Sequence, residues 1–154
     1  MAQYFFRDPG NVEVLTPVIG KNSEAFKIGT PVTIDSSGFL AGCTSAGEKV
    51  YGICIEDKTC ASDNQTVAQY KPLVVDAQDV IIAYTTNGTL AQTDVGEYAD
   101  VATNSSGSIT MGNPGATGQF LCTGINPDDT TMGYFRVAEP QQSPYLTYPL
   151  TKLR

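Results

Sequence analysis

A short unit that occurs twice constrains the fold most: a glycine, an alternating run, the tripeptide Ser-Ser-Gly, and a second short run. Residues 28–42 read IGTPVTIDSSGFLAG, and residues 96–112 read GEYADVATNSSGSITMG. Alternation of apolar and polar residues predicts a strand, and turn residues between two such runs predict a β-hairpin. In the first unit, Gly38 is free to take a positive φ angle. We therefore expect each copy to be a hairpin in a β-rich body.

Along the rest of the chain, turn residues recur about every 8–12 positions, as in a β-sandwich or barrel. Residues 49–57, KVYGICIED, are apolar on both faces and predict a central strand. Residues 12–19, VEVLTPVI, predict an edge strand, because Pro17 has no N–H for a ladder. Further strands are expected in TVAQY, KPLVV, VIIAYTT, GQFLCTGI and GYFRVAE, with Tyr51, Tyr70, Tyr84 and Tyr98 on strands.

No segment shows a helical apolar stripe, and the best candidate for one short helix is residues 90–95. Apolar residues make up 41% of the 154 residues and charged residues only 16%, with 15 glycines, which fits a turn-rich β protein better than a helical bundle. The predicted fold class is all-β, with a small barrel or sandwich body and extended N- and C-terminal arms.

Three regions are distinguished by composition. Residues 1–27 form an N-terminal arm and edge strand, residues 28–139 the β body, and residues 140–154 an extended arm rich in Pro and Tyr. Their net charges are 0, −9 and +2, within a total of −7. The prolines of the last region favour an extended, pre-ordered chain.

Both arms carry large apolar side chains that need a surface to bury against. Two alternatives stay open for each arm: it folds back onto its own body, or it docks on a neighbouring subunit. A basic tail on an acidic body is self-complementary, which helps orientation and encounter. The candidate interface residues are Tyr4, Phe5, Phe6, Tyr145, Tyr148, Leu150, Lys152 and Arg154.

The residue inventory argues against catalysis. The chain has no histidine, which removes the commonest general base and the usual catalytic triads. The carboxylate neighbours Glu56-Asp57 and Asp128-Asp129 are expected to face water or opposite sides of a strand. The second pair, with nearby threonines, offers at most a loose Ca²⁺ site, and a solvated turn is the preferred interpretation. We expect no enzyme and no cofactor.

The four cysteines, Cys43, Cys54, Cys60 and Cys122, have no C-x-x-C spacing. With no histidine to complete a zinc site, we expect no metal. Free buried thiols are the expectation, while a disulfide between two of them stays open. Three N-x-S/T sequons, at Asn64, Asn87 and Asn104, are attributed to chance.

Charge and hydropathy also exclude classes of partner. A net charge of −7 argues against direct binding of nucleic acid, which needs a basic surface. The start, MAQYFFRDPG, lacks the basic and long apolar segments of a signal peptide, so none is expected. The longest apolar runs are strand-sized, so no membrane association is expected.

Residues 28–55 carry a resemblance to a known family. The hairpin G-T-P-V-T-I-D-S-S-G-F-L-A-G is followed, after a turn of small residues, by G-E-K-V-Y-G-I-C-I. This arrangement resembles the start of the β-domain in several head decoration (cement) proteins of tailed bacteriophages. The proline-rich C-terminal arm does not match a common pattern of that family.

The resemblance implies a β-barrel or β-tulip body and homotrimers on the outer surface of an icosahedral head. It also implies a function: clamping neighbouring major capsid proteins against the pressure of packaged DNA. The chain would then be made in the host cytoplasm and end on the virion. The alternatives are another virion structural module, such as a tail or fibre, a cell-surface or glycan-binding β-module, and, last, a hydrolase.

Overall fold

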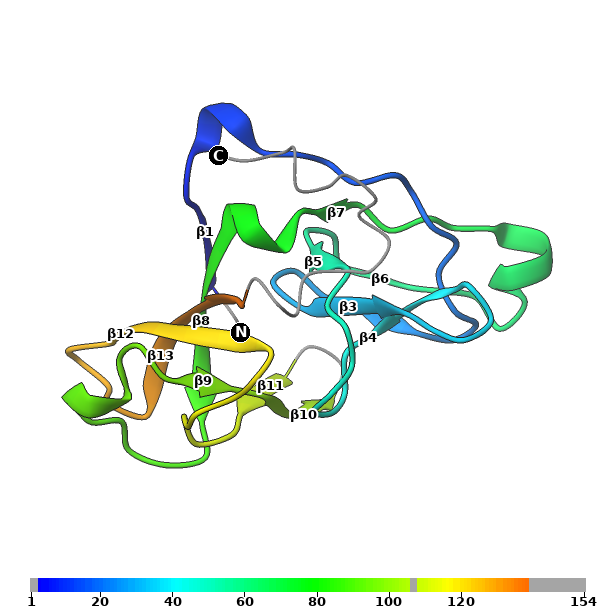
Figure 1. Ribbon diagram of the computed structural model, residues 1–154. Helices are drawn as coiled ribbons and strands as arrows, with labels where there is room; N and C mark the ends of the chain where they lie inside the picture. Colours follow the sequence, from blue (N-terminus) through cyan, green and yellow to red (C-terminus); the bar gives the residue numbers. More distant parts are fainter. Residues whose placement is uncertain (1–2, 106–107, 139–154) are drawn as a thin grey trace.

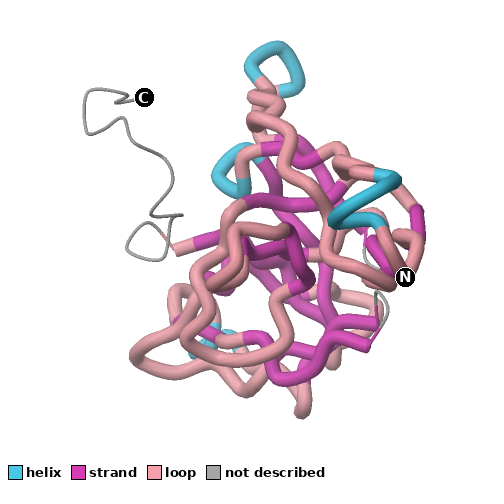
Figure 2. The backbone as a smooth tube through the Cα atoms, turned by 90° about the vertical axis from the view of Figure 1, so that its right-hand side faces the viewer, coloured by secondary structure: helices cyan, strands magenta, loops and turns pink. Residues whose placement is uncertain are grey.

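The computed structural model describes residues 3–105 and 108–138, and for Gln3, Phe5 and Ser105 it describes the backbone alone. The strands are β1 (Gln3–Phe6), β2 (Ala25–Phe26), β3 (Pro31–Ile34), β4 (Leu40–Gly42), β5 (Gly52–Cys54), β6 (Lys58–Thr59), β7 (Val74–Val75), β8 (Val80–Thr86), β9 (Tyr98–Ala99), β10 (Val101–Ser105), β11 (Ser108–Met111), β12 (Phe120–Ile125) and β13 (Met132–Val137). Four short helical turns join them: η1 (Pro9–Asn11), η2 (Asn64–Ala68), η3 (Ala77–Asp79) and η4 (Gln92–Asp94). In Figure 2 these turns are cyan segments in the loops around the magenta strands. The protein is all-β, as the sequence predicts.

The largest sheet is a nearly closed barrel. Its strand order is β10-β11-β8-β13-β12-β9, and β1 pairs with β8 beside this path. The two end strands, β9 and β10, are separated along the chain by Asp100 alone. The chain itself therefore bridges the two ends of the sheet, and the six strands form a barrel-like ring (Figure 1).

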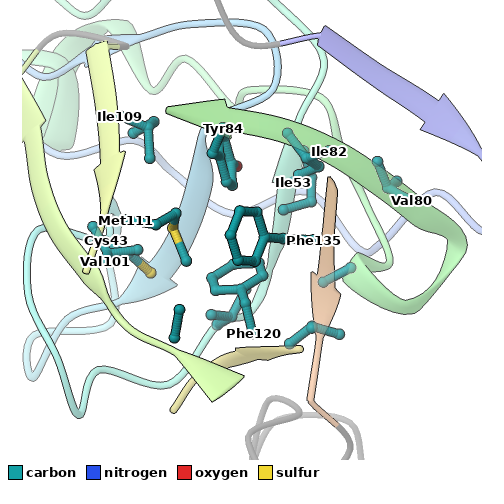
Figure 3. Close-up of a cluster of buried hydrophobic side chains, with 14 of the residues drawn as sticks. Cys43, Ile53, Val80, Ile82, Tyr84, Val101, Ile109, Met111, Phe120 and Phe135 are labelled. Carbon is teal, nitrogen blue, oxygen red and sulfur yellow. The ribbon is translucent and has the colours of Figure 1, made fainter. Parts of the chain in front are cut away.

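Aromatic rings fill the interior of this ring. The side chains of Tyr84, Phe120 and Phe135 are buried and point toward one another (Figure 3). The Tyr84 ring lies edge-on to Phe120, with ring centroids 6.0 Å apart, and stacks on Phe135 at 6.3 Å. Each such ring stabilises the fold by about 2–3 kcal/mol through burial. The barrel is thus a packed core.

A second sheet, with the order β4-β3-β5-β7, lies beside the barrel (Figure 1). Its central strand β5 is buried on both faces: Ile53 packs into the barrel core, and Cys54 packs with Phe26 and Val32 on the other side. This confirms the predicted central strand in residues 49–57. The Tyr84 hydroxyl donates to the carbonyl of Gly29 at 2.6 Å and so joins the two halves of the molecule.

Both predicted hairpins are present. In the first, β3 pairs antiparallel with β4, and the Asp35 carboxylate accepts hydrogen bonds from the backbone N–H groups of Ser37 and Phe39. Gly38 has a φ angle of +87°, which an L side chain rarely adopts. In the second, β10 pairs antiparallel with β11. Turn chemistry in the sequence was sufficient to locate both.

Some local expectations were wrong. Residues 12–19 do not form a strand: Val14 makes only an isolated bridge to Val75. Residues 66–70 were expected to be a strand, but the chain forms the helical turn η2 there. The buried Asn64 side chain causes this turn, since its amide donates to the carbonyls of Gly20 and Tyr70.

The predictions for the four tyrosines and for the short helix were confirmed only in part. Tyr84 and Tyr98 lie on β8 and β9, whereas Tyr51 and Tyr70 lie outside the strands. The expected short helix at residues 90–95 is the 3₁₀ turn η4, where the Asp94 carboxylate accepts from the N–H of Ala91 at 2.7 Å. This turn is shorter than expected.

Candidate functional site

The N-terminal aromatic segment lies on the barrel as strand β1. It pairs antiparallel with β8, from Gln3 opposite Ala83 to Phe6 opposite Val80. The next residue, Arg7, continues the register by donating its backbone N–H to the Asp79 carbonyl at 2.8 Å. Of the two alternatives for this segment, the structure therefore shows the first, since the chain folds back onto its own body.

One edge of β1 faces away from β8. Hydrogen-bonded and non-hydrogen-bonded pairs alternate in an antiparallel ladder, and the Arg7 N–H points toward β8. By this alternation the N–H and C=O groups of Tyr4 and Phe6 point outward. Within residues 3–105 and 108–138, no strand pairs with this outer edge. We call it the β1 edge: the outward backbone groups of Tyr4 and Phe6.

The side chains of Tyr4 and Phe6 attach this strand to the barrel. Both are partly buried and pack against the barrel core, with their rings edge-to-face at a centroid distance of 5.4 Å. Half-buried aromatic rings on a sheet edge suit a contact surface, because they add apolar area without leaving the strand free to fray. Phe5, the third residue of the cluster, is described by its backbone alone.

The β1 edge lacks the usual protection of an edge strand. Natural edges carry charged residues, prolines or bulges that block pairing with another chain. The sequence of β1 is QYFF, without a charge or a proline. The first charged residues follow it: the Arg7 guanidinium donates to the Gln78 carbonyl at 3.0 Å, and Asp8 caps η1. An edge that no other described strand pairs with, and that carries no such protection, is a ready template for an added strand.

The other predicted interface residues, Tyr145, Tyr148, Leu150, Lys152 and Arg154, lie in the C-terminal arm, outside the described residues. The structure does not bring them together with Tyr4 and Phe6. Sequence reasoning placed an edge strand at residues 12–19 and missed β1. The run of aromatic residues in QYFF, which favour strands, was the signal that identifies it.

The first adjacent pair of carboxylates, Glu56 and Asp57, accepts hydrogen bonds from backbone N–H groups and from a hydroxyl group. Glu56 accepts from the Tyr70 hydroxyl at 2.5 Å and from the Leu73 N–H at 2.7 Å. Burial and this hydrogen bond raise the pKa of Tyr70. Asp57 accepts from the N–H of Ile28 at 2.8 Å. This pair of acidic residues therefore ties together segments that are distant in the sequence, at Ile28, Tyr70 and Leu73.

The second acidic pair is a turn. The Asp129 carboxylate accepts from the backbone N–H and the hydroxyl of Thr131, at 3.0 and 2.6 Å. These two bonds lower the pKa of Asp129, a fully exposed group. Asp128 lies in the same turn and donates its N–H to the Asn126 side chain. Among the described residues, no group of three or more Cys, Asp and Glu side chains is placed to hold a metal ion.

All four thiols are buried and free. Burial is the main cause that raises their pKa values, for Cys54 to about 11. A thiol held in its neutral form is a poor nucleophile and a poor metal ligand. The cysteines are therefore core residues. The sequon residue Asn64 is also fully buried, so its side chain is inaccessible to a glycosylating enzyme in the folded protein.

One cleft, of about 560 Å³, lies on the β3–β4 hairpin. Lys21 and Lys49 line it together with Glu24, Asp35 and Glu48. Each of these three carboxylates already accepts a hydrogen bond from a backbone N–H group. Its described lining contains no aromatic ring of the kind that glycan sites favour. The cleft mixes both signs of charge and singles out no ligand.

No protein-family model, no curated protein and no solved structure matches this chain. The described part of the structure also contains no helix of the length and apolar character that crossing a bilayer requires. Interpretation of the site therefore rests on the geometry of its own residues, and the β1 edge is the feature with the clearest binding chemistry.

Proposed function

We propose that this chain is a structural, non-enzymatic protein: a capsid decoration (cement) protein of a tailed bacteriophage. In this proposal it binds the outer surface of the head as a homotrimer and clamps neighbouring major capsid proteins. The observation that carries the proposal is the β1 edge, because an unprotected strand edge beside half-buried aromatic rings is suited to joining another chain.

The resemblance of residues 28–55 to phage head decoration proteins also supports this proposal. The residues that carry it form the β3–β4 hairpin and the central strand β5. These elements contribute side chains to the barrel core and to the hydrophobic cluster of Phe26, Val32 and Cys54 on the other side of β5. In this proposal the resembling segment is part of the scaffold, and the contact surfaces lie elsewhere on the chain. A scaffold with separate binding edges is what a clamping protein requires.

Charge supports the same assignment. Residues 28–139 carry a net charge of −9, whereas the C-terminal arm carries +2. An acidic body suits the outside of a shell, away from the packaged DNA, because a DNA contact would need basic residues. The basic arm complements the acidic surface of a neighbouring copy, which favours oriented encounter.

The mechanism is mechanical. Burial of a few hundred Å² of apolar surface per arm stabilises each contact by roughly 5–8 kcal/mol before the ordering costs. In a trimer the contacts act together, so that release of one subunit requires several to break at once. The proposal is that this raises the barrier to rupture of the head.

The test uses the heads of the phage whose genome carries this gene, stripped of the protein. Purified full-length chain is added back, and its binding is measured by sedimentation together with the temperature at which DNA is released. We expect saturable binding on the outer surface and a higher release temperature. A variant without residues 140–154 should bind less and show a smaller mass in solution. Heads that take up none of the full-length chain would overturn the proposal.

A further inference from the structure

The β1 edge has a defined length and a defined set of open groups. It presents the N–H and C=O groups of Tyr4 and Phe6, that is, about four hydrogen bonds for one added strand. Because β1 is four residues long, a partner strand needs only about four residues. Neither the barrel strands nor the second sheet fills this position within the described part of the chain.

A segment of matching length lies in the C-terminal arm. Residues 144–149 read PYLTYP, so two prolines bound the four residues from Tyr145 to Tyr148. Tyr, Leu and Thr are compatible with a strand, and Tyr and Thr favour one. A proline at each end lacks the N–H that would continue the ladder, so pairing would stop there. The segment therefore has the composition and the length of a short added strand.

The exit of the arm is close to the β1 edge. Strand β13 runs antiparallel to β8 and ends at Val137, on the side of the barrel where Phe6 faces Val80. β13 and β1 flank β8 on opposite sides, so the arm leaves the barrel about 10 Å from β1, two strand spacings away.

The residues that connect the body to this segment favour its pairing with a neighbouring copy over pairing with the β1 edge of its own chain. Residues 139–144 read EPQQSP, and a proline-rich stretch of this length extends about 19 Å. To reach its own β1, the arm would have to reverse direction within these residues and cross the end of β8, where η3 lies. The charge difference between arm and body suits a contact with either body, so the preference for a neighbouring copy comes from the path of the chain.

We infer that residues 145–148 of one copy add as a strand to the β1 edge of a neighbouring copy. This inference rests on the homotrimer of the proposed function and deepens it by naming the contact. It does not require the capsid, so it is tested in solution. Each copy gives one strand and receives one, which closes a ring when the copies number three.

The test is amide hydrogen exchange of the full-length chain, followed residue by residue by NMR over about a hundredfold range of protein concentration. The N–H groups of Tyr4 and Phe6 are expected to exchange at least about tenfold more slowly at high concentration than at low concentration. The N–H of Phe5 faces β8 and serves as the internal reference, with protection at every concentration.

Two matched variants test whether residues 145–148 are the segment that pairs with the β1 edge. Leu146→Pro/Thr147→Pro removes both central N–H groups of the segment and is expected to abolish the concentration-dependent protection. Gln142→Pro/Ser143→Pro places the same change just outside the segment and should preserve it. Both pairs lie beyond β13, so the described body is left unchanged.

Three results would overturn the inference. Protection that does not depend on concentration, in a chain whose mass in solution is that of a monomer, would mean that the arm occupies its own edge. No protection at any concentration would mean that the edge stays open. Protection that survives Leu146→Pro/Thr147→Pro would mean that another segment fills it. In each case, binding of the chain to phage heads would still leave the proposed function standing.

Discussion

The side-chain oxygen of Gln119 accepts a hydrogen bond from the backbone N–H of Val101 at 2.9 Å. This bond lies where the barrel-like sheet closes, between β9 and β10. The Gln119 amide also donates to the carbonyls of Ser45 and Glu48, at 3.2 and 2.5 Å, and its backbone N–H donates to Asp100 at 3.0 Å. One fully buried side chain thus joins the seam of the barrel to the loop between β4 and β5.

Replacement of Gln119 should therefore be costly. Gln119→Leu removes the partner of the buried N–H of Val101 and of the partly buried carbonyls of Ser45 and Glu48, and we expect the free energy of unfolding to fall by about 2–4 kcal/mol. Chemical denaturation measures the change. Gln92→Leu, at an exposed position of η4, is the control and should change stability by less than about 0.5 kcal/mol. Equal midpoints for the two variants would contradict the role assigned to Gln119.

The hydroxyl of Tyr84 provides a second test. Tyr84→Phe removes the hydrogen bond to the Gly29 carbonyl and keeps the ring. We expect a loss of about 1–2 kcal/mol, since a buried carbonyl loses its donor. Tyr98→Phe is the matched control, because Tyr98 is only partly buried on β9. If Tyr84→Phe were as stable as the control, the link between the two halves would not depend on this bond.

The first hairpin can be tested at its glycine. A Cβ atom would meet nothing within 4 Å at either Gly38 or Gly115, but only Gly38 has a positive φ angle. Gly38→Ala should therefore destabilise the protein by about 1 kcal/mol through backbone strain alone. Gly115→Ala should be neutral or slightly stabilising. Thermal unfolding measures both, and the same melting temperature for the two variants would argue against a strained turn.

The buried thiols predict a loss of stability in alkali. The pKa of Cys54 is raised by burial from 9.0 in the reference state to about 11 in the fold. A group whose pKa is raised on folding contributes stability that is complete below the unfolded pKa. It is lost as the pH rises from about 9 toward 11. Unfolding midpoints should therefore fall across this window.

Cys54→Ser isolates this contribution. The Cys54 thiol donates to the carbonyl of Glu56 at 3.3 Å, and a serine hydroxyl retains a donor there without titrating in this range. The variant should lose less stability between pH 9 and 11 than the parent chain, although the other thiols and the buried Tyr84 still titrate. Parallel curves for the two proteins would show that Cys54 does not contribute.

Parts of the fold could be predicted because their causes are local. Asp35 and Gly38 make the first turn with bonds that span only a few residues, so Ser-Ser-Gly between alternating runs was enough. The strand β5 was predicted as central because its apolar residues face both sides. The candidate site was predicted only in part: the aromatic residues Tyr4 and Phe6 were identified, but their strand was not.

The remaining features depend on partners far away in the sequence. Nothing near residues 66–70 indicates a helical turn, because its cause is the contact of Asn64 with Gly20, 44 residues away. Nothing near Gln119 indicates that its amide would reach the loop of Glu48. Nothing near Tyr4 indicates that β8 would pair with one edge of its strand, while no other described strand pairs with the opposite edge.

The sequence by itself determined the all-β class, the positions of both hairpins, the burial of the thiols and the charge contrast between body and C-terminal arm. These follow from turn chemistry, from alternation along single strands and from side-chain type, which act over a few residues. Only the tertiary structure decided how the barrel closes, which buried amide joins the seam to its neighbouring loop, and which edge of β1 is unpaired within the described residues. Those depend on hydrogen-bond pairings between distant segments, and many such pairings are compatible with the same local pattern until the core packs.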